Sequence, residues 1–389
     1  MSIIFKLVKL TGVAKGALPI VLGFVGSIII LNYFSSDSLS NKVNFNDLAL
    51  GKNTSSYNAL IDNHQVHCRD LIDAELCING YKNKYSNSNY DIVLWLGNSQ
   101  LHSINQMKPG EETAIPILHR KLIDLQKYLM AFSQPNANLQ EHYVLLNFLV
   151  SKLPISTIVL PVVFDDMRET GIRKSINDAL KNQFVANELK KTDIGKKILS
   201  NYNNEDHFGN EKDALGDTTQ ESFESFLDTK LGLYWHTWKE RPSLRGKFFY
   251  EFLYQSRNWL FNINASSTRK VIPGRYISNM QALNEMLQLS REKKIKVLVY
   301  IVPIRNDVKI PYDLVQYKSF KEEVGSLSRK YKNVVFRDLG AIVPSELWGV
   351  KTSTTIGKDV ELDFMHFQAG GHKILADSIL LGLDLLWSQ

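Results

Sequence analysis

Three apolar runs limit what this chain can fold into. They cover residues 91–96, 155–164 and 295–302 and consist mostly of valine, isoleucine and leucine, and a further strand is expected over residues 334–339. Runs of this length without alternating polar residues are typical of strands buried on both faces. Amphipathic helical patterns lie between them, so the sequence predicts an α/β fold with a central parallel sheet covered by helices.

Apolar side chains at helical spacing mark the segments between the strands. We expect helices over residues 115–132, 139–152, 277–293 and 312–330, and a last one that reaches Trp387. A short helix is also expected around residues 56–71. Residues 133–138 (SQPNAN) are rich in turn formers, and residues 345–361 are expected to form an irregular loop.

The first apolar run ends at Gly97, and Asn98 and Ser99 open the next helix. Ligands and reacting groups gather at the carboxyl ends of parallel strands. The N–H groups at the start of a helix point outward and can hold a developing oxyanion, which suits a nucleophilic serine. The commoner role of such residues is to cap the helix.

A second polar pattern, Asp363-Phe364-Met365-His366, precedes the final helix. Asp and His three residues apart can share one face of a turn. The carboxylate then fixes the imidazole tautomer while the ring serves as base for a distant serine. The D-x-x-H pair is weak evidence alone, but together with the serine turn it makes Ser99, Asp363 and His366 the catalytic candidates. His102 follows Ser99 by three residues and either faces this site or is structural.

An uncharged apolar segment near the N-terminus, residues 17–34, is long enough to span a bilayer as a helix. Lys6, Lys9 and Lys15 precede it, and no acidic residue does. The positive-inside rule therefore puts the N-terminus in the cytoplasm of a single-pass inner or plasma membrane protein, with the rest in the periplasmic or extracytoplasmic space. A cleaved signal peptide is the alternative, but the segment lacks a clear small-x-small cleavage site.

Changes in composition along the chain indicate its division into units. The expected units are a cytoplasmic tip with a transmembrane anchor, an extracytoplasmic stalk and one large domain, over residues 1–35, 36–88 and 89–389. Residues 165–275 lack strand patterns and form an expected helical insertion. Its second half is aromatic-rich, between residues 234 and 261, and these side chains serve either internal packing or a docking or lid face.

The two cysteines of the chain, Cys68 and Cys77, both lie in the expected stalk. In an oxidising compartment they can close a short disulfide loop, and two free thiols are the alternative. We expect no metal and no cofactor, because neither a ligand cluster nor a glycine-rich phosphate loop is present. The net charge of +6 is spread along the chain without a basic, aromatic stripe, so nucleic-acid binding is not expected.

The early Gly97-Asn98-Ser99 turn and the late D-x-x-H pair resemble the SGNH (GDSL-like) hydrolase family. The chain looks closest to the DltD family of teichoic-acid D-alanylation and to SGNH-type proteins of exopolysaccharide O-acetylation. The shared features include the outward N-terminal anchor, a polar loop with glutamine over residues 133–140, and an insertion after the next strand. The resemblance implies a flavodoxin-like three-layer fold, catalytic Ser99, Asp363 and His366, and a multi-pass membrane-bound O-acyltransferase (MBOAT) as partner.

The sequence departs from the family pattern in three places. Asn98 replaces the aspartate of Gly-Asp-Ser, no glycine lies near Asn136, and Asp165-Asp166 stands where a Gly-x-Asn-Asp block is expected. The candidates for oxyanion or substrate contacts are five polar side chains: Asn98, Gln100, Asn136, Asn138 and Arg305. For Arg305, an ordinary ion pair with Asp307 is the alternative.

Three functions remain open on this basis. The first is an O-acyltransferase that passes an acetyl, D-alanyl or other acyl group through a serine acyl-enzyme to a cell-envelope or secreted polysaccharide. The second is a carbohydrate esterase that uses the same residues. The third is a non-catalytic scaffold or glycan-binding partner of an MBOAT protein.

Overall fold

The computed structural model describes residues 60–61, 64–69, 71, 73–85, 90–102, 104, 107–108, 110–205, 265–352 and 360–389. The expected anchor over residues 17–34, the first part of the stalk and the aromatic half of the insertion lie outside these residues. Among the helices that the structure does describe, none is long and apolar enough to cross a membrane. The described residues all fall within one compact unit.

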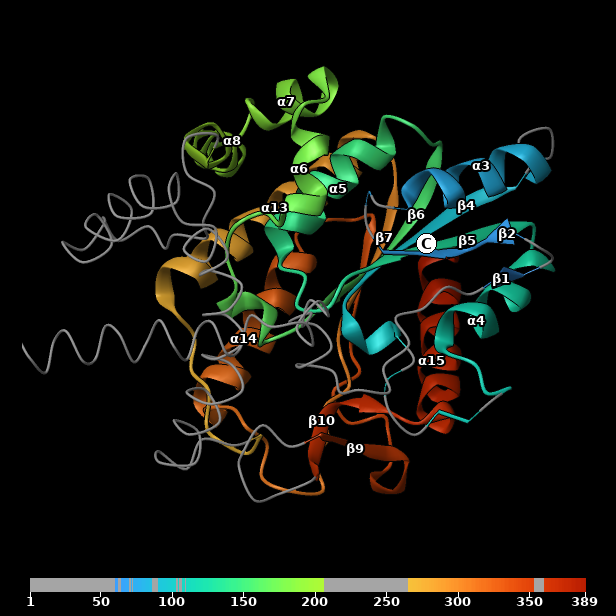
Figure 1. The fold of residues 1–389 in the computed structure, drawn as a ribbon, viewed down its shortest axis with the longest axis vertical. Helices are drawn as coiled ribbons and strands as arrows, with labels where there is room; N and C mark the ends of the chain where they lie inside the picture. Colours follow the sequence, from blue (N-terminus) through green and yellow to red (C-terminus); the bar gives the residue numbers. More distant parts are fainter. Residues whose placement is uncertain are drawn as a thin grey trace, which may run out of the picture. The chain divides into compact units, whose positions relative to one another are not determined.

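A parallel sheet of six strands forms the centre of the described structure (Figure 1), in the order β3-β5-β4-β6-β7-β8. The strands are β3 (His67–Cys68), β4 (Asp91–Gly97), β5 (Lys127–Ser133), β6 (Ile155–Val162), β7 (Lys296–Ile301) and β8 (Val334–Asp338). This confirms the expected α/β fold with a central parallel sheet. Each of the four expected segments forms one strand, and the three inner ones, β4, β6 and β7, are apolar on both faces because helices cover both.

Nine α-helices accompany the sheet in the described part of the chain. They are α3 (Ala74–Tyr85), α4 (Ala114–Ile123), α5 (Leu139–Val150), α6 (Lys174–Leu180), α7 (Gln183–Leu189), α8 (Asp193–Glu205), α13 (Pro273–Glu292), α14 (Leu314–Ser328) and α15 (Ala369–Trp387). Helix α5 packs against α13, and α4 packs against α15. Figure 1 shows these two pairs on opposite sides of the sheet, which is consistent with a three-layer fold.

Strand β4 lies inside the sheet, between β5 and β6, and its residues 92–97 are buried. The chain runs from β4 to β5 on one side and then crosses back to β6 on the other. Where successive connections leave a parallel sheet in opposite directions, a crevice opens at the carboxyl ends of the strands. The turn after β4, which carries Ser99, lies at this switch point of the strand order.

The expected helix over residues 115–132 is wrong in its second half. Helix α4 ends at Ile123, and β5 begins at Lys127. Between them Gln126 adopts a φ of 55°, which no helix tolerates, and Leu125 is 50% exposed. Leu129 therefore points from a strand and not from a helix. The apolar residues of this segment fit a helical period by coincidence, because a buried strand is apolar at every position.

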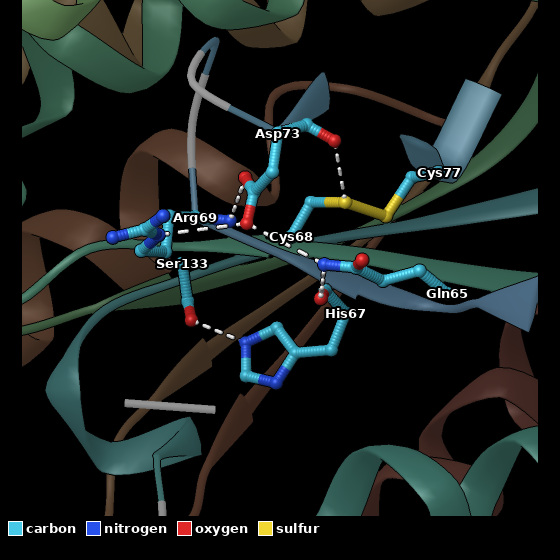
Figure 2. Close-up of a disulfide and its surroundings, with 7 residues drawn as sticks. All are labelled: Gln65, His67, Cys68, Arg69, Asp73, Cys77 and Ser133. Atoms are coloured by element: carbon cyan, nitrogen blue, oxygen red, sulfur yellow. Dashed lines mark hydrogen bonds and ion pairs between the residues drawn. A yellow bond between two sulfur atoms is a disulfide. The ribbon is translucent and has the colours of Figure 1, made fainter. Parts of the chain in front are cut away.

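The short helix expected around residues 56–71 is also wrong. The described residues of this region form β1 (Leu60–Ile61), β2 (His64–Gln65) and β3, and a helix follows only as α3. Cys68 of β3 and Cys77 of α3 are joined by a disulfide bond (Figure 2), as the compartment argument favoured. The disulfide thus ties the edge strand of the sheet to the helix beside it.

The loop expected over residues 345–361 is more regular than its sequence indicates. It contains the 3-10 turn η4 (Ser345–Leu347) and β9 (Trp348–Thr352), which pairs with β10 (Val360–Phe367) in a separate antiparallel sheet. The first part of the insertion is helical as expected, with η2 (Asp166–Arg168) followed by α6, α7 and α8.

Candidate active site

Ser99 lies on a sharp turn between β4 and the 3-10 helix η1 (Ser99–Leu101). Asn98 caps this helix, since its Oδ1 accepts the backbone N–H of Gln100 at 3.0 Å. The other end of the Asn98 side chain donates to Asp166 Oδ2 at 3.0 Å. Asn98 therefore has the capping role, and both polar ends of its side chain are used in shaping the turn.

Only glycine fits at the position where the strand meets the turn. A Cβ on Gly97 would collide with the Leu101 side chain and lie 3.1 Å from the Cβ of Ser133, the paired residue of β5. The missing side chain lets the turn fold back onto the sheet edge. This places Ser99, which is 7% exposed, at the carboxyl end of β4.

Asp363 and His366 lie on β10, at an irregularity in its pairing with β9 between Leu362 and Phe367. Asp363 Oδ1 accepts the backbone N–H groups of Met365 at 2.9 Å and His366 at 3.0 Å. A carboxylate that bonds to backbone two or three residues on stabilises a tight turn. The expected turn therefore exists inside a strand, and it brings both side chains to one side.

The structure brings the three catalytic candidates together in one hydrogen-bonded chain. His366 Nδ1 lies 2.8 Å from Asp363 Oδ2, and His366 Nε2 lies 2.9 Å from Ser99 Oγ. With Nδ1 protonated and donating to the carboxylate, Nε2 is left as the acceptor for the Ser99 hydroxyl proton. This arrangement can activate the serine as a nucleophile.

Asp363 is 2% exposed. Burial by itself would raise the pKa of its carboxyl group. The His366 ring, its hydrogen bond and the bond from the Met365 N–H outweigh burial and lower that pKa below its usual value. Asp363 is therefore ionised at neutral pH, as a residue that orients an imidazole and stabilises its charged form must be.

Gln100 connects the serine turn to the histidine strand. Its Nε2 donates to the backbone oxygen of Pro303 at 2.9 Å and to that of Met365 at 2.8 Å. One side chain thus ties η1 to the end of β7 and to the residue next to His366. Gln100 is 2% exposed, so its side chain holds the site together and has almost no surface that a substrate could contact.

The two asparagines of the polar loop after β5, Asn136 and Asn138, have different surroundings and different roles. Asn138 caps α5, accepts the N–H groups of Gln140 and Glu141, and donates its amide to the Gly171 oxygen at 2.9 Å. Asn136 is exposed and has a φ of 54°, a left-handed conformation that glycine adopts most readily and asparagine tolerates. Asn136 therefore supplies the backbone shape of the glycine that the sequence lacks here.

Arg305 forms the ion pair that was the alternative to a pocket role. Its Nε lies 2.8 Å from Asp307 Oδ1, and its Nη2 lies 3.1 Å from Asp307 Oδ2. The hydrogen bonds from Arg305 lower the pKa of the Asp307 carboxyl. The Arg305 backbone N–H donates to the Phe364 oxygen at 3.0 Å, so this residue also binds the strand segment between Asp363 and His366.

A further acidic residue at the site is Asp166, in the acidic pair that follows β6. Asp166 is 6% exposed and contacts Asn98, the neighbour of Ser99. Burial raises the pKa of its carboxyl group well above the usual value, and the Asn98 hydrogen bond only partly opposes this. The signal in the sequence was an acidic pair directly after a predicted strand, which belongs at the same sheet edge as Ser99.

Neither the protein-family models nor the curated proteins compared with this sequence match it. No group of three or more His, Cys, Asp or Glu side chains that could hold a metal ion occurs among the residues that the structure describes.

Proposed function

We propose that this chain is an SGNH-type serine O-acyltransferase. The observation that carries the proposal is the chain of hydrogen bonds from Asp363 through His366 to Ser99, at 2.8 and 2.9 Å. The same order of groups activates serine in unrelated acyl-transfer enzymes. The strand order also supports it, because β5-β4-β6-β7-β8 is the 2-1-3-4-5 order of flavodoxin-like sheets, with the serine at the switch point.

The proposed reaction has two acyl-transfer steps. His366 Nε2 takes the Ser99 proton while Oγ attacks the carbonyl carbon of an ester or thioester. The Ser99 backbone N–H, at the start of η1, is a donor for the oxyanion. The leaving group departs with the proton from His366. A sugar or polyol hydroxyl then gives its proton to His366 and attacks the acyl-enzyme. The acyl–Oγ bond breaks, and His366 returns the proton to Ser99 Oγ.

The acceptor and the partner follow from the family resemblance. It implies that the acyl group is acetyl or D-alanyl, that the acceptor is a cell-envelope or secreted polysaccharide, and that an MBOAT membrane protein delivers the acyl group. In this proposal the N-terminal segment anchors the chain to the membrane, and the site faces the extracytoplasmic space. No metal or other cofactor takes part in the proposed steps.

An esterase is the second candidate. It is favoured by the fact that serine, histidine and aspartate are already assembled within one chain, with no partner needed to complete the geometry. In that case water replaces the sugar hydroxyl in the second step. A non-catalytic scaffold has less support, since such a role does not require these three side chains to lie in hydrogen-bond contact.

The test compares the full-length protein in detergent with its Ser99→Ala variant. Each receives a chromogenic acetyl ester, with and without a polysaccharide acceptor. We expect ester cleavage that is lost in Ser99→Ala, and acetyl groups on the acceptor that mass spectrometry detects. Cleavage without transfer would favour the esterase, and equal rates for both proteins would contradict serine catalysis.

A further inference from the structure

A second serine, with two histidines around it, lies on the strand beside the one that leads to the proposed nucleophile. Ser133 is the last residue of β5 and pairs with Gly97 of β4. Its Oγ lies 2.6 Å from His67 Nε2 and 2.7 Å from His102 Nε2. Figure 2 shows the hydroxyl of Ser133 pointing at the His67 ring. We call these three residues the histidine–serine bridge.

The bridge is not a second catalytic site. Ser133 and His102 are each 1% exposed and His67 is 2% exposed, so no substrate reaches the hydroxyl. Burial lowers the pKa of both rings, that of His102 to about 4, and each ring also lies in the field of other histidines. Both imidazoles are therefore neutral at neutral pH.

The hydrogen bonds of the bridge require a defined arrangement of protons. A serine hydroxyl has one proton, so Ser133 donates to one ring and must accept from the other. The two imidazoles consequently have opposite tautomers at their Nε2 atoms. His102 Nδ1 is buried without a hydrogen-bond partner, so the bond to Ser133 is the one that the structure gives to the His102 ring and fixes how the ring is turned.

One end of the bridge reaches the turn of the nucleophile. His102 is the C-terminal cap of η1, and its backbone N–H donates to the backbone carbonyl oxygen of Ser99 at 3.0 Å. Fixing the His102 ring on Ser133 therefore fixes the residue that closes the turn of Ser99. Because Ser133 is also the strand partner of Gly97, it holds the turn both at its start and at its end.

The other end of the bridge reaches the edge of the sheet. His67 belongs to β3, a strand of only two residues that pairs with β5. The next residue, Cys68, is bonded to Cys77 of α3. The Arg69 backbone N–H also donates to Asp73 Oδ1 at 2.7 Å (Figure 2). These bonds hold a strand that is too short to be stable on its own ladder.

We propose that the histidine–serine bridge positions Ser99, and that it transmits the anchoring of β3 to the turn of the nucleophile. Ser133, His67 and His102 are positioning residues in this scheme, since none of them touches the reacting atoms. The inference rests on the proposed function, because it concerns the reactivity of Ser99. It also makes a structural claim about the turn that does not depend on any reaction.

The test uses the full-length protein and two separate readouts. The first is the rate at which a fluorophosphonate probe labels Ser99. The second is hydrogen exchange of the peptide that contains residues 91–102. We expect Ser133→Ala to slow labelling about tenfold or more and to speed exchange in the turn, because a misplacement of about 1 Å can cost about a hundredfold in rate.

Ser156→Ala is the matched control. Ser156 also donates its hydroxyl to β4, to the Ile92 oxygen at 3.1 Å, but near the amino end of the strand. We expect it to leave labelling and exchange in the turn unchanged. If Ser133→Ala behaves like Ser156→Ala in both readouts, the proposal is wrong.

A double-mutant cycle tests whether the bridge acts as a unit. His67→Phe fills the ring space without a nitrogen that could bond to Ser133 Oγ. We expect it to slow labelling in the wild-type background and to have little further effect after Ser133→Ala. If the effects of His67→Phe and Ser133→Ala on the labelling rate add fully, the proposed transmission is overturned. If Ser133→Ala does not fold, His67→Phe alone tests the bridge, and an unchanged labelling rate would contradict it.

Failure of the proposed function would be visible separately. If wild-type protein is labelled no faster than Ser99→Ala, serine catalysis is contradicted. The exchange data then decide the bridge alone, since faster exchange in Ser133→Ala but not in Ser156→Ala still supports it.

Discussion

Asp363 binds His366 at two points. Its Oδ1 accepts the backbone N–H of His366 at 3.0 Å, and its Oδ2 lies 2.8 Å from Nδ1 of the ring. One carboxylate thus fixes both where the histidine backbone lies and how its ring is turned. The D-x-x-H spacing allows this, because a carboxylate that closes a turn can still reach the side chain three residues on.

Asp363→Asn tests this double contact. The amide can still accept the backbone N–H, so the fold should be kept. An amide that donates to Nδ1 favours the wrong ring tautomer, and we expect the rate of Ser99 acylation to fall by about 10³ to 10⁴. Pre-steady-state ester cleavage measures it. Asp307→Asn, which alters a carboxylate paired with Arg305, should leave the rate nearly unchanged, and an equal loss there would contradict the assignment.

Gly97→Ala tests the fit of the serine turn. The added methyl group collides with Leu101 and crowds Ser133, and overpacking of this kind costs about 1–3 kcal/mol. We expect that loss in urea unfolding, together with reduced labelling of Ser99. Gly274→Ala is the comparison, because nothing lies within 4 Å of a Cβ there. Equal stability of the two variants would mean that the turn relaxes easily.

The sequence allowed the catalytic candidates to be predicted because two local patterns, each weak alone, point to the same chemistry. The buried run of β4 ends at a glycine, which placed Ser99 at a sheet edge. The D-x-x-H spacing placed Asp363 and His366 on one turn. Neither pattern required knowledge of the register between strands.

The histidine–serine bridge could not be predicted, because it depends on elements that have no periodic signal. Strand β3 is two residues long, and residues 56–71 were expected to be helical. The sequence predicts the end of a helix where strand β5 lies, so it gives no sign that Ser133 pairs with Gly97. Without that register, His67, His102 and Ser133 are three unrelated polar residues in the sequence.

Asp166→Asn tests the buried carboxyl beside the serine turn. Burial raises the pKa of Asp166, so its ionised form opposes folding at neutral pH. An asparagine keeps an oxygen for the Asn98 amide without that charge, and we expect equal or greater stability at pH 7 in urea unfolding. Asp166→Ala leaves the Asn98 donor unpaired and should cost about 1–3 kcal/mol. A clear loss of stability in Asp166→Asn at pH 7 would contradict this and show that the ionised carboxylate stabilises the fold.

Removal of the disulfide should destabilise the protein. Cys68 and Cys77 are nine residues apart, and closing a loop of that size stabilises the folded state by about 2.5 kcal/mol through the entropy of the unfolded chain. We expect about that loss in a Cys68→Ser, Cys77→Ser double variant. Reductant should lower the unfolding midpoint of the wild type but not that of the variant. A variant as stable as the oxidised wild type would contradict this.

Acid should unfold this protein well above the range where its carboxylates titrate. Burial lowers the pKa of four histidines, to about 4 for His102, to about 3 for His142 and His372, and well below 6.5 for His67. Below pH 6.5 these histidines bind more protons in the unfolded chain than in the folded one, so they lower stability as pH falls from 6.5 toward about 4, and the raised pKa of Asp166 offsets only part of this. At pH 5 His102, His142 and His372 each cost about 2 kcal/mol. Urea unfolding at pH 7, 6 and 5 measures the loss. Glutamine cannot titrate, so the loss of stability between pH 7 and pH 5 should be smaller in His142→Gln by the contribution of one histidine. Equal stability of the wild type at pH 7 and pH 5 would show that these rings are charged in the folded protein.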